Sequence, residues 1–214
     1  MERRVWGWLG PASGILFVAF LVVAVAIGEG DPGVDPNDPA ERIARRLAAD
    51  SDDNQLAFTF FGLATFFFIW FLSHLRDRFR RVGDEGEWLV SVFWAGGLLS
   101  VAVFLIQGLV QAAQFSIDDY GRDIQAAKAL FALQWNSATL LGPPVAAMMG
   151  AAAIVILRFG ILPRWLGWLA ALSFVTAIVM PWIPFFALWV LLVSIVLLVE
   201  GRRSATPKAT AATA

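Results

Sequence analysis

The stretch that decides the fold runs from Gln107 to Gly150 and reads QGLVQAAQFSIDDYGRDIQAAKALFALQWNSATLLGPPVAAMMG. It contains the largest group of polar side chains next to apolar sequence, and the only Pro-Pro pair of the chain. The sequence on both sides of it is typical of membrane-spanning helix. The polar residues and the prolines therefore set this stretch apart from the rest of the chain.

The composition is that of an integral membrane protein. Of the 214 residues, 59% are hydrophobic and 15% are charged, whereas a soluble domain has about 45–50% apolar and about 25% charged residues. The charged residues lie in short segments between long apolar runs, which indicates several membrane-spanning helices. We therefore predict an all-α fold, a polytopic transmembrane helix bundle that forms one domain over residues 1–200.

Six apolar runs define the predicted spans. The stretch from Trp165 to Val199 carries no charge and is long enough for two short spans, with Pro181 and Pro184 marking the turn between them. The tail 201–214 is predicted to be disordered and cytoplasmic. The predicted spans cover residues 5–27, 56–75, 88–113, 130–157, 165–180 and 185–199.

The first apolar run has a second interpretation. A basic start, an apolar run and the sequence Ala24-Val25-Ala26 also fit a cleaved signal peptide, which would leave five spans. The run has about 23 residues, however, whereas the apolar part of a signal peptide usually has about 7–15. Trp6 and Trp8 also favour a helix that starts at the membrane interface. We predict that this run is the first helix of the bundle.

A short amphipathic helix is predicted in the polar loop after the first span. Asp38 can cap it, Pro39 suits its first position, and it would run to about Ala49. Ile43 and Leu47 share one face. We predict that this face lies on the lipid headgroups, and the alternative is that it docks a partner.

The basic residues predict the orientation of the bundle. Six spans place both termini on one side, and the excess of basic residues on that side favours the cytoplasm. We therefore predict a multi-pass protein of the bacterial inner membrane with both termini cytoplasmic. Of the 16 Lys and Arg residues, those that would lie outside are Arg42, Arg45, Arg46, Arg122 and Lys128.

The available side chains argue against catalysis. The chain has no cysteine and one histidine, His74, so thiolate nucleophiles and Cys- or His-ligated metals lack candidates. No Asp, Glu, Lys or Arg lies well inside a predicted span, whereas pumps and many transporters need such groups. We predict no enzyme, no cofactor and no metal site, and the net charge of −1 predicts no nucleic-acid partner. The external acids lack the spacing of a calcium loop and favour a solvated surface; they are Asp50, Asp52, Asp53, Asp118, Asp119 and Asp123.

The polar side chains of the opening stretch form the candidate ligand site. Gln107, Gln111 and Gln114 share one face of the third span, at i, i+4 and i+7. The fourth span is an antiparallel neighbour, so its polar residues could meet them. Counting about 20 residues per span puts most of these groups near the outer boundary. They form either a solvated extension of two helices or an outward-facing polar vestibule. The residues of the fourth span are Gln134, Asn136, Ser137 and Thr139.

The proline pair predicts a weak point in the fourth span. Pro143 and Pro144 lack a backbone N–H and so cannot donate to the carbonyls of Thr139 and Leu140. In hydrocarbon such carbonyls need protein or water partners. The pair would lie in the outer half or near the midplane, as a static kink or as a broken helix that lines a ligand pocket.

Small residues at a spacing of four predict how the helices pack. They allow the backbones of neighbouring helices to approach closely. The predicted contact positions are Gly10 and Gly14, then Gly96, Gly97 and Ser100, then Gly142, Ala146 and Gly150, and finally Gly167 and Ala171.

The chain resembles a bacterial family of uncharacterised six-helix membrane proteins of unknown function. The resemblance rests on the external loop with an Ala/Arg helix, on Phe-Leu-Ser-His-Leu-Arg at 71–76, and on Leu-Pro-Arg-Trp-Leu-Gly-Trp at 162–168. It covers most of the chain and implies no activity and no functional residue.

Two functions remain as hypotheses. The first is a non-enzymatic partner or regulatory subunit that contacts the lipid bilayer and either a membrane protein partner or further copies of itself. The second is binding or transport of a small neutral or lipidic ligand in a pocket between the third and fourth spans.

Overall fold

The computed structural model describes residues 2–28, 35–49, 51–115, 124–179 and 183–205, and these parts form the predicted all-α helix bundle. Two short 3-10 turns, η1 (Arg80–Val82) and η2 (Asp84–Gly86), join the second and third long helices. The α-helices are α1 (Glu2–Gly28), α2 (Ala40–Ala49), α3 (Ser51–Phe79), α4 (Glu87–Phe115), α5 (Ile124–Thr139), α6 (Gly142–Phe159), α7 (Arg164–Val179) and α8 (Ile183–Ala205).

Five helical stretches within the described residues are long and apolar enough to cross a membrane, by length and composition. They correspond to α1, α3, α4, α5 together with α6, and α8. The sixth predicted span is the shorter helix α7, whose 16 residues rise about 24 Å, less than the roughly 30 Å of a bilayer's hydrocarbon core. The chain is therefore a membrane protein with five long apolar stretches and one short one.

The last helix continues beyond its predicted end. The predicted span closed at residue 199, yet α8 runs through Ala205. Residues 201–205, predicted to be disordered, are therefore helical, while residues 206–214 of the tail lie outside the described residues. Pro181 of the predicted proline turn also lies outside them, and Pro184 belongs to the start of α8.

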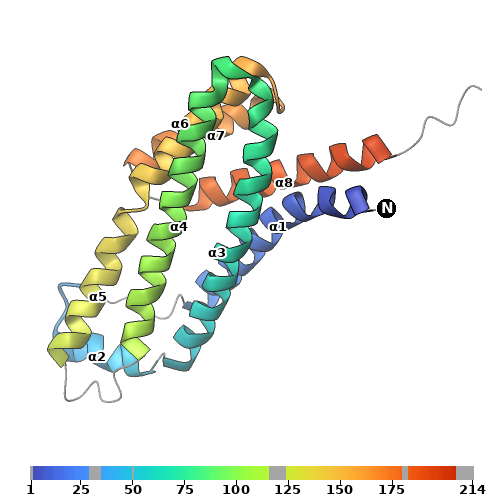
Figure 1. Cartoon of the computed structure of the whole chain (residues 1–214). Coiled ribbons are helices and arrows are strands. Elements are labelled where there is room, and N and C mark those ends of the chain that lie inside the picture. The colour runs from blue at the N-terminus through green and yellow to red at the C-terminus, as the bar shows by residue number, and fades with distance from the viewer. Residues whose placement is uncertain (1, 29–34, 50, 116–123, 180–182, 206–214) are drawn as a thin grey trace, which may run out of the picture.

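The long helices α3, α4 and the α5–α6 pair run side by side, and the starting end of α1 and the final end of α8 emerge on the same side (Figure 1). The most extensive packing is between α1 and α3, and α6 packs against both α4 and α7. The main core is rich in large rings that are fully buried, among them Phe17, Phe68, Phe71, Phe186 and Trp189. Helix α1 is therefore an integral part of the bundle.

Glycines bring these helices into close contact, as the sequence predicted. A Cβ atom added to Gly14 of α1 would lie 2.0 Å from Ser194 Oγ of α8 and 2.6 Å from a ring carbon of Phe71. One added to Gly96 of α4 would lie 2.8 Å from the carbonyl oxygen of Pro144. Real Cβ atoms essentially never approach so closely, so only glycine fits at these crossings.

One end of the bundle carries most of the charged contacts, and we call it the basic end: residues 76–81 with Arg158 and Arg164. Arg78 pairs with Glu200 of α8. Arg158 lies 3.8 Å from Glu85, and the Arg76 guanidinium lies 4.8 Å from the ring centroid of Trp94. These contacts join α3 to α4 and α8, and the end of α6 to η2.

At the opposite end, α2 packs on α5. The apolar face of α2 buries Ile43 and Ala44 against Ala127, with Ile124 and Phe131 beside them. Lys128 Nζ donates to the carbonyl oxygen of Asp38 at 3.0 Å. The prediction that this face lies on the headgroups is therefore wrong for Ile43, because a helix of the same chain covers it, while the side chain of Leu47 lies outside the described residues. We call α2 and α5 the outer unit.

The predicted cap of α2 is replaced by other contacts. The carboxylate of Asp38 accepts from the backbone N–H of Asp35 at 2.9 Å and from Arg42 at 3.3 Å. The helix itself begins at Ala40, directly after Pro39.

Candidate functional site

The predicted polar site lies along the contact between α4 and α5. Gln107 and Gln111 of α4 are half-buried, as is Gln134 of α5. Asn136 and Thr139 of α5 are exposed. Ser137 is buried, at 4% exposure. The side chain of Gln114 lies outside the described residues.

Three of these polar groups donate to their own helix. Asn136 Nδ2 donates to the carbonyl of Ala132 at 2.7 Å. Ser137 Oγ donates to the carbonyl of Gln134 at 2.7 Å, and Thr139 Oγ1 donates to the carbonyl of Asn136 at 2.6 Å. Such local bonds satisfy the donors within the last turns of α5. They stabilise the end of this helix, and these donors are not directed at α4.

The fourth predicted span is broken. Helix α5 ends at Thr139, α6 begins at Gly142, and Pro143 and Pro144 stand in the first turn of α6. The predicted span over 130–157 therefore consists of two helices interrupted at residues 140–141, and the prediction that this break lines a ligand pocket stays a prediction. The physical reason is that proline lacks a donor inside a helix but suits the first turn, where no donor is needed.

Local hydrogen bonds close the break. The N–H of Leu140 donates to Ser137 O at 3.1 Å, and the N–H of Val145 donates to Leu141 O at 3.2 Å. Pro144 is level with Gly96, which is nine residues after the start of α4 at Glu87, a rise of about 14 Å.

A cavity lies elsewhere, between α1 and α3. Its volume is about 200 Å³, and no charged side chain lines it. Ser13, a buried residue, uses its hydroxyl to donate to the carbonyl of Gly10 at 2.6 Å, so the polar group is satisfied within α1. The lining residues are Leu9, Ala12, Ser13, Leu16, Phe66, Phe67 and Trp70.

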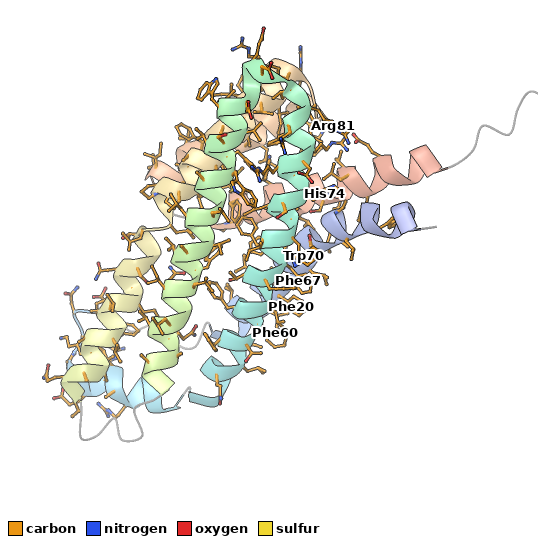
Figure 2. All side chains as sticks on the ribbon, viewed as in Figure 1. Phe20, Phe60, Phe67, Trp70, His74 and Arg81 are labelled. Atoms are coloured by element: carbon orange, nitrogen blue, oxygen red, sulfur yellow. The ribbon has the colours of Figure 1, made fainter. Side chains whose placement is uncertain are left out.

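The cavity has a close helix contact beyond one end and stacked rings beyond the other. Toward the basic end, Gly10 packs on His74, since an added Cβ would lie 2.1 Å from His74 Cγ. In the other direction, Phe20 stacks on Phe67 at 5.6 Å and 11° and on Phe60 at 5.8 Å and 23°. Figure 2 shows these residues in sequence along α3, from Phe60 through Phe67 and Trp70 to His74.

Sequence reasoning missed this cavity, although one signal was present. Residues 10–14 read Gly-Pro-Ala-Ser-Gly, a run of small side chains with one of the contact glycines at each end. The residues opposite on α3 are the large rings Phe66, Phe67 and Trp70. Small side chains facing rings that do not fill the space between helices leave a void. That signal depends on knowing that α1 pairs with α3.

The external acids cannot be placed. Asp118, Asp119 and Asp123 lie outside the described residues, as does Asp50, and the side chains of Asp52 and Asp53 are also outside them. Among the residues that the structure does describe, no group of three or more His, Asp or Glu side chains could hold a metal ion.

Comparison of the chain with protein-family models, with curated proteins and with solved structures found no match. The resemblance to a bacterial membrane protein family therefore stays a prediction, and the function has to be argued from the geometry alone.

Proposed function

We propose that this chain is a non-enzymatic membrane protein that binds a phospholipid, with one acyl chain in the cavity between α1 and α3. The observation that carries the proposal is the cavity lining: six apolar residues, and Ser13 with its hydroxyl already bonded to Gly10. A polar ligand would lose its hydration there without gaining hydrogen bonds. The lining therefore favours a hydrocarbon.

The size of the cavity favours a single chain. Its volume of about 200 Å³ is below the roughly 300–1,000 Å³ of pockets that enclose drug-sized ligands. The cavity also lies on a lipid-facing surface, where Leu9, Leu16, Phe66 and Trp70 are each more than a third exposed. A chain can therefore enter sideways from the bilayer.

Packing, rather than the hydrophobic effect, would hold the chain. Lipid tails are as apolar as the side chains of the cavity, so moving a chain from the bilayer gains little hydrophobic free energy. An empty void, in contrast, leaves its lining without dispersion contacts on one side. A chain that fills the void restores these contacts, so binding should saturate at one lipid per protein.

The charges beyond the cavity favour a phospholipid over a free fatty acid. On the face of α3 that carries Trp70, Asp77 follows about 10 Å along the helix, and Arg81 stands beyond the end of α3, in η1. The nearer Arg76 and Arg78 contact Trp94 and Glu200 instead, so a fatty-acid carboxylate at the end of the cavity would meet the acid of this face before its arginine. A phospholipid places its uncharged ester there and keeps its headgroup at the membrane surface.

This proposal keeps the hypothesis of a lipidic ligand and moves its site. Three of the polar residues along the contact between α4 and α5 bond within α5, whereas the cavity between α1 and α3 has the apolar lining that a lipid chain needs. Mutations at Gln107 or Gln111 are therefore expected to leave lipid binding unchanged.

The test is lipid occupancy measured by native mass spectrometry after release from phosphatidylcholine nanodiscs. Ala12→Phe fills the cavity from α1 and should abolish the retained lipid. Ala102→Phe, at an exposed position of α4, is the matched control and should retain it. Equal lipid retention by both variants would refute the proposal.

A second candidate, the partner subunit, is favoured by one side chain. Asn136 is exposed near the end of α5, as are Leu133 at 53% and Leu140, just after the helix, at 57%. One N–H of its amide donates to Ala132, and its second N–H and its carbonyl oxygen, among lipid-facing leucines, favour association with another helix, because hydrogen bonds between helices satisfy polar groups in a membrane. We propose a second copy of this chain as that partner.

Cysteine crosslinking tests the second candidate directly, because the chain has no cysteine of its own. Leu133→Cys should form a disulfide-linked dimer under mild oxidation in nanodiscs that hold two copies. Leu172→Cys, at an exposed position of α7, serves as the control. Equal crosslinking at both positions would mean random collision and would remove the candidate.

A further inference from the structure

We propose that the stack of Phe20, Phe60 and Phe67 limits how far an acyl chain can extend along the α1–α3 cavity. The inference rests on the proposed lipid binding and adds a specificity to it. The three rings lie on the line of the cavity, on the side away from the basic end (Figure 2). They would act as an end stop for the chain.

The length of the cavity supports an end stop. On α1 the lining residues run from Leu9 to Leu16, which corresponds to about 10 Å of helix. One leaflet of the hydrocarbon core is about 15 Å thick, half of the full core. The cavity therefore covers only about two thirds of a leaflet, and a longer chain must leave it before the bilayer centre.

The position of Phe20 makes it the central ring of the stop. It follows Leu16 by four residues, so both side chains lie on the same face of α1. Its ring is nearly parallel to that of Phe67, which itself lines the cavity. Phe20 therefore occupies the path along which the cavity would otherwise continue.

Contacts with the main core and between the rings hold the end stop in place. Phe20 and Phe67 are half-buried and both pack against the main core. Phe60 lies two turns before Phe67 on α3, and its ring centroid is 5.8 Å from that of Phe20. Rotation of Phe20 out of the path would break its contacts with both rings, so the stop should persist when a chain is bound.

The test uses phosphatidylcholine probes that carry a diazirine at the end of one acyl chain, in a short-chain and a long-chain form. In the native protein, the short probe should label the lining residues near Leu16 and Phe67 in a saturable way. The long probe should label these residues severalfold less, because its chain end lies outside the cavity. Labelled residues are identified by peptide mass spectrometry.

Removing the Phe20 ring should allow a long acyl chain to extend further along the line of the cavity. In Phe20→Ala, labelling by the long probe should rise severalfold and should appear near Phe60 and Leu63. Phe174→Ala, a ring removed from the exposed surface of α7, should leave the labelling pattern unchanged. Phe20→Leu keeps apolar bulk in place and provides a second variant in case Phe20→Ala does not fold; it should give an intermediate increase.

Two failures of this experiment are distinguishable. If the short probe labels the native protein without saturation, and Ala12→Phe does not reduce that labelling, the lipid site and the end stop both fall. If labelling saturates but the long and short probes label alike, with Phe20→Ala and Phe20→Leu making no difference, only the end stop is overturned.

Discussion

The two ends of the bundle are held together in different ways. Near the basic end, glycines of α1 let side chains of α3 and α8 pack directly against its backbone, and large rings such as Phe71 and Trp189 fill the space between these helices. At the other end, the outer unit has a small separate cluster built around Ile43, Ala44 and Ala127. The buried members of the main core come from α1, α3, α4, α6, α7 and α8 and from the residues just before α6 and α7.

The break between α5 and α6 is the border between these regions. Leu141, the last residue of the break, already belongs to the main core, whereas Ala127 of α5 belongs to the outer cluster. Because the helix is interrupted here, α5 can pack in the outer cluster and α6 in the main core without the two helices sharing one axis. The larger buried core lies on the α6 side of the break, and we expect most of the stability there; Phe67 of the proposed lipid site packs against it.

The largest loss of stability is expected from a substitution at Gly14. In Gly14→Leu, the new side chain would collide with Ser194 and Phe71, which we expect to cost about 3 kcal/mol or more through overpacking. The melting temperature in detergent should fall sharply. Gly62→Leu on α3 is the matched control, because no atom lies within 4 Å of its added Cβ. Similar losses in both variants would show that the region is not packed as described.

A smaller loss of stability, confined to the outer unit, is expected from a substitution at Ile43. Its side chain is fully buried, and Ile43→Ala should cost about 2 kcal/mol, the low end for such a truncation, because the surrounding cluster is small. Hydrogen exchange should speed up in α2 and at the start of α5 while the main core keeps its protection. Equal loss of protection in α3 would mean that the two regions unfold together.

The smallest effect on stability is expected from the proline pair. Replacing Pro143 and Pro144 by alanine restores two backbone donors, but the pair already stands in a first turn, where donors are dispensable. We expect a change in stability below about 1 kcal/mol. Hydrogen exchange around residues 140–146 should slow if α5 and α6 become continuous. If this variant no longer retained lipid, the claim that the break and the lipid site are independent would be wrong.

Much of the fold was predictable because apolar runs reveal helices directly. The helices α1, α3, α4 and α8 contain the predicted spans, and the contact glycines Gly10, Gly14 and Gly96 lie where their spacing predicted. The first run was also open to interpretation as a signal peptide. In the structure α1 continues past residues 24–26 and buries Phe17 and Leu21 in the core, and the alternative of a cleaved signal peptide stays open.

The remaining features depend on which helices pair, and sequence patterns do not fix that. The amphipathic pattern of α2 predicted an apolar face but not that α5 would cover it. The prolines predicted a weak point and left both a kink and a break open. The cavity needs both the small residues Ala12 and Ser13 and the rings of α3, which lie more than 50 positions apart in the sequence.

The position of a bound lipid chain tests the central claim most directly. The measurement is photolabelling in phosphatidylcholine nanodiscs with a phospholipid that carries a diazirine in one acyl chain, followed by peptide mapping. We predict saturable labels on Leu9, Leu16, Phe66 or Trp70 that disappear in Ala12→Phe and persist in Ala102→Phe. Labels spread evenly over exposed residues of α4 and α7, and unchanged in Ala12→Phe, would contradict the account.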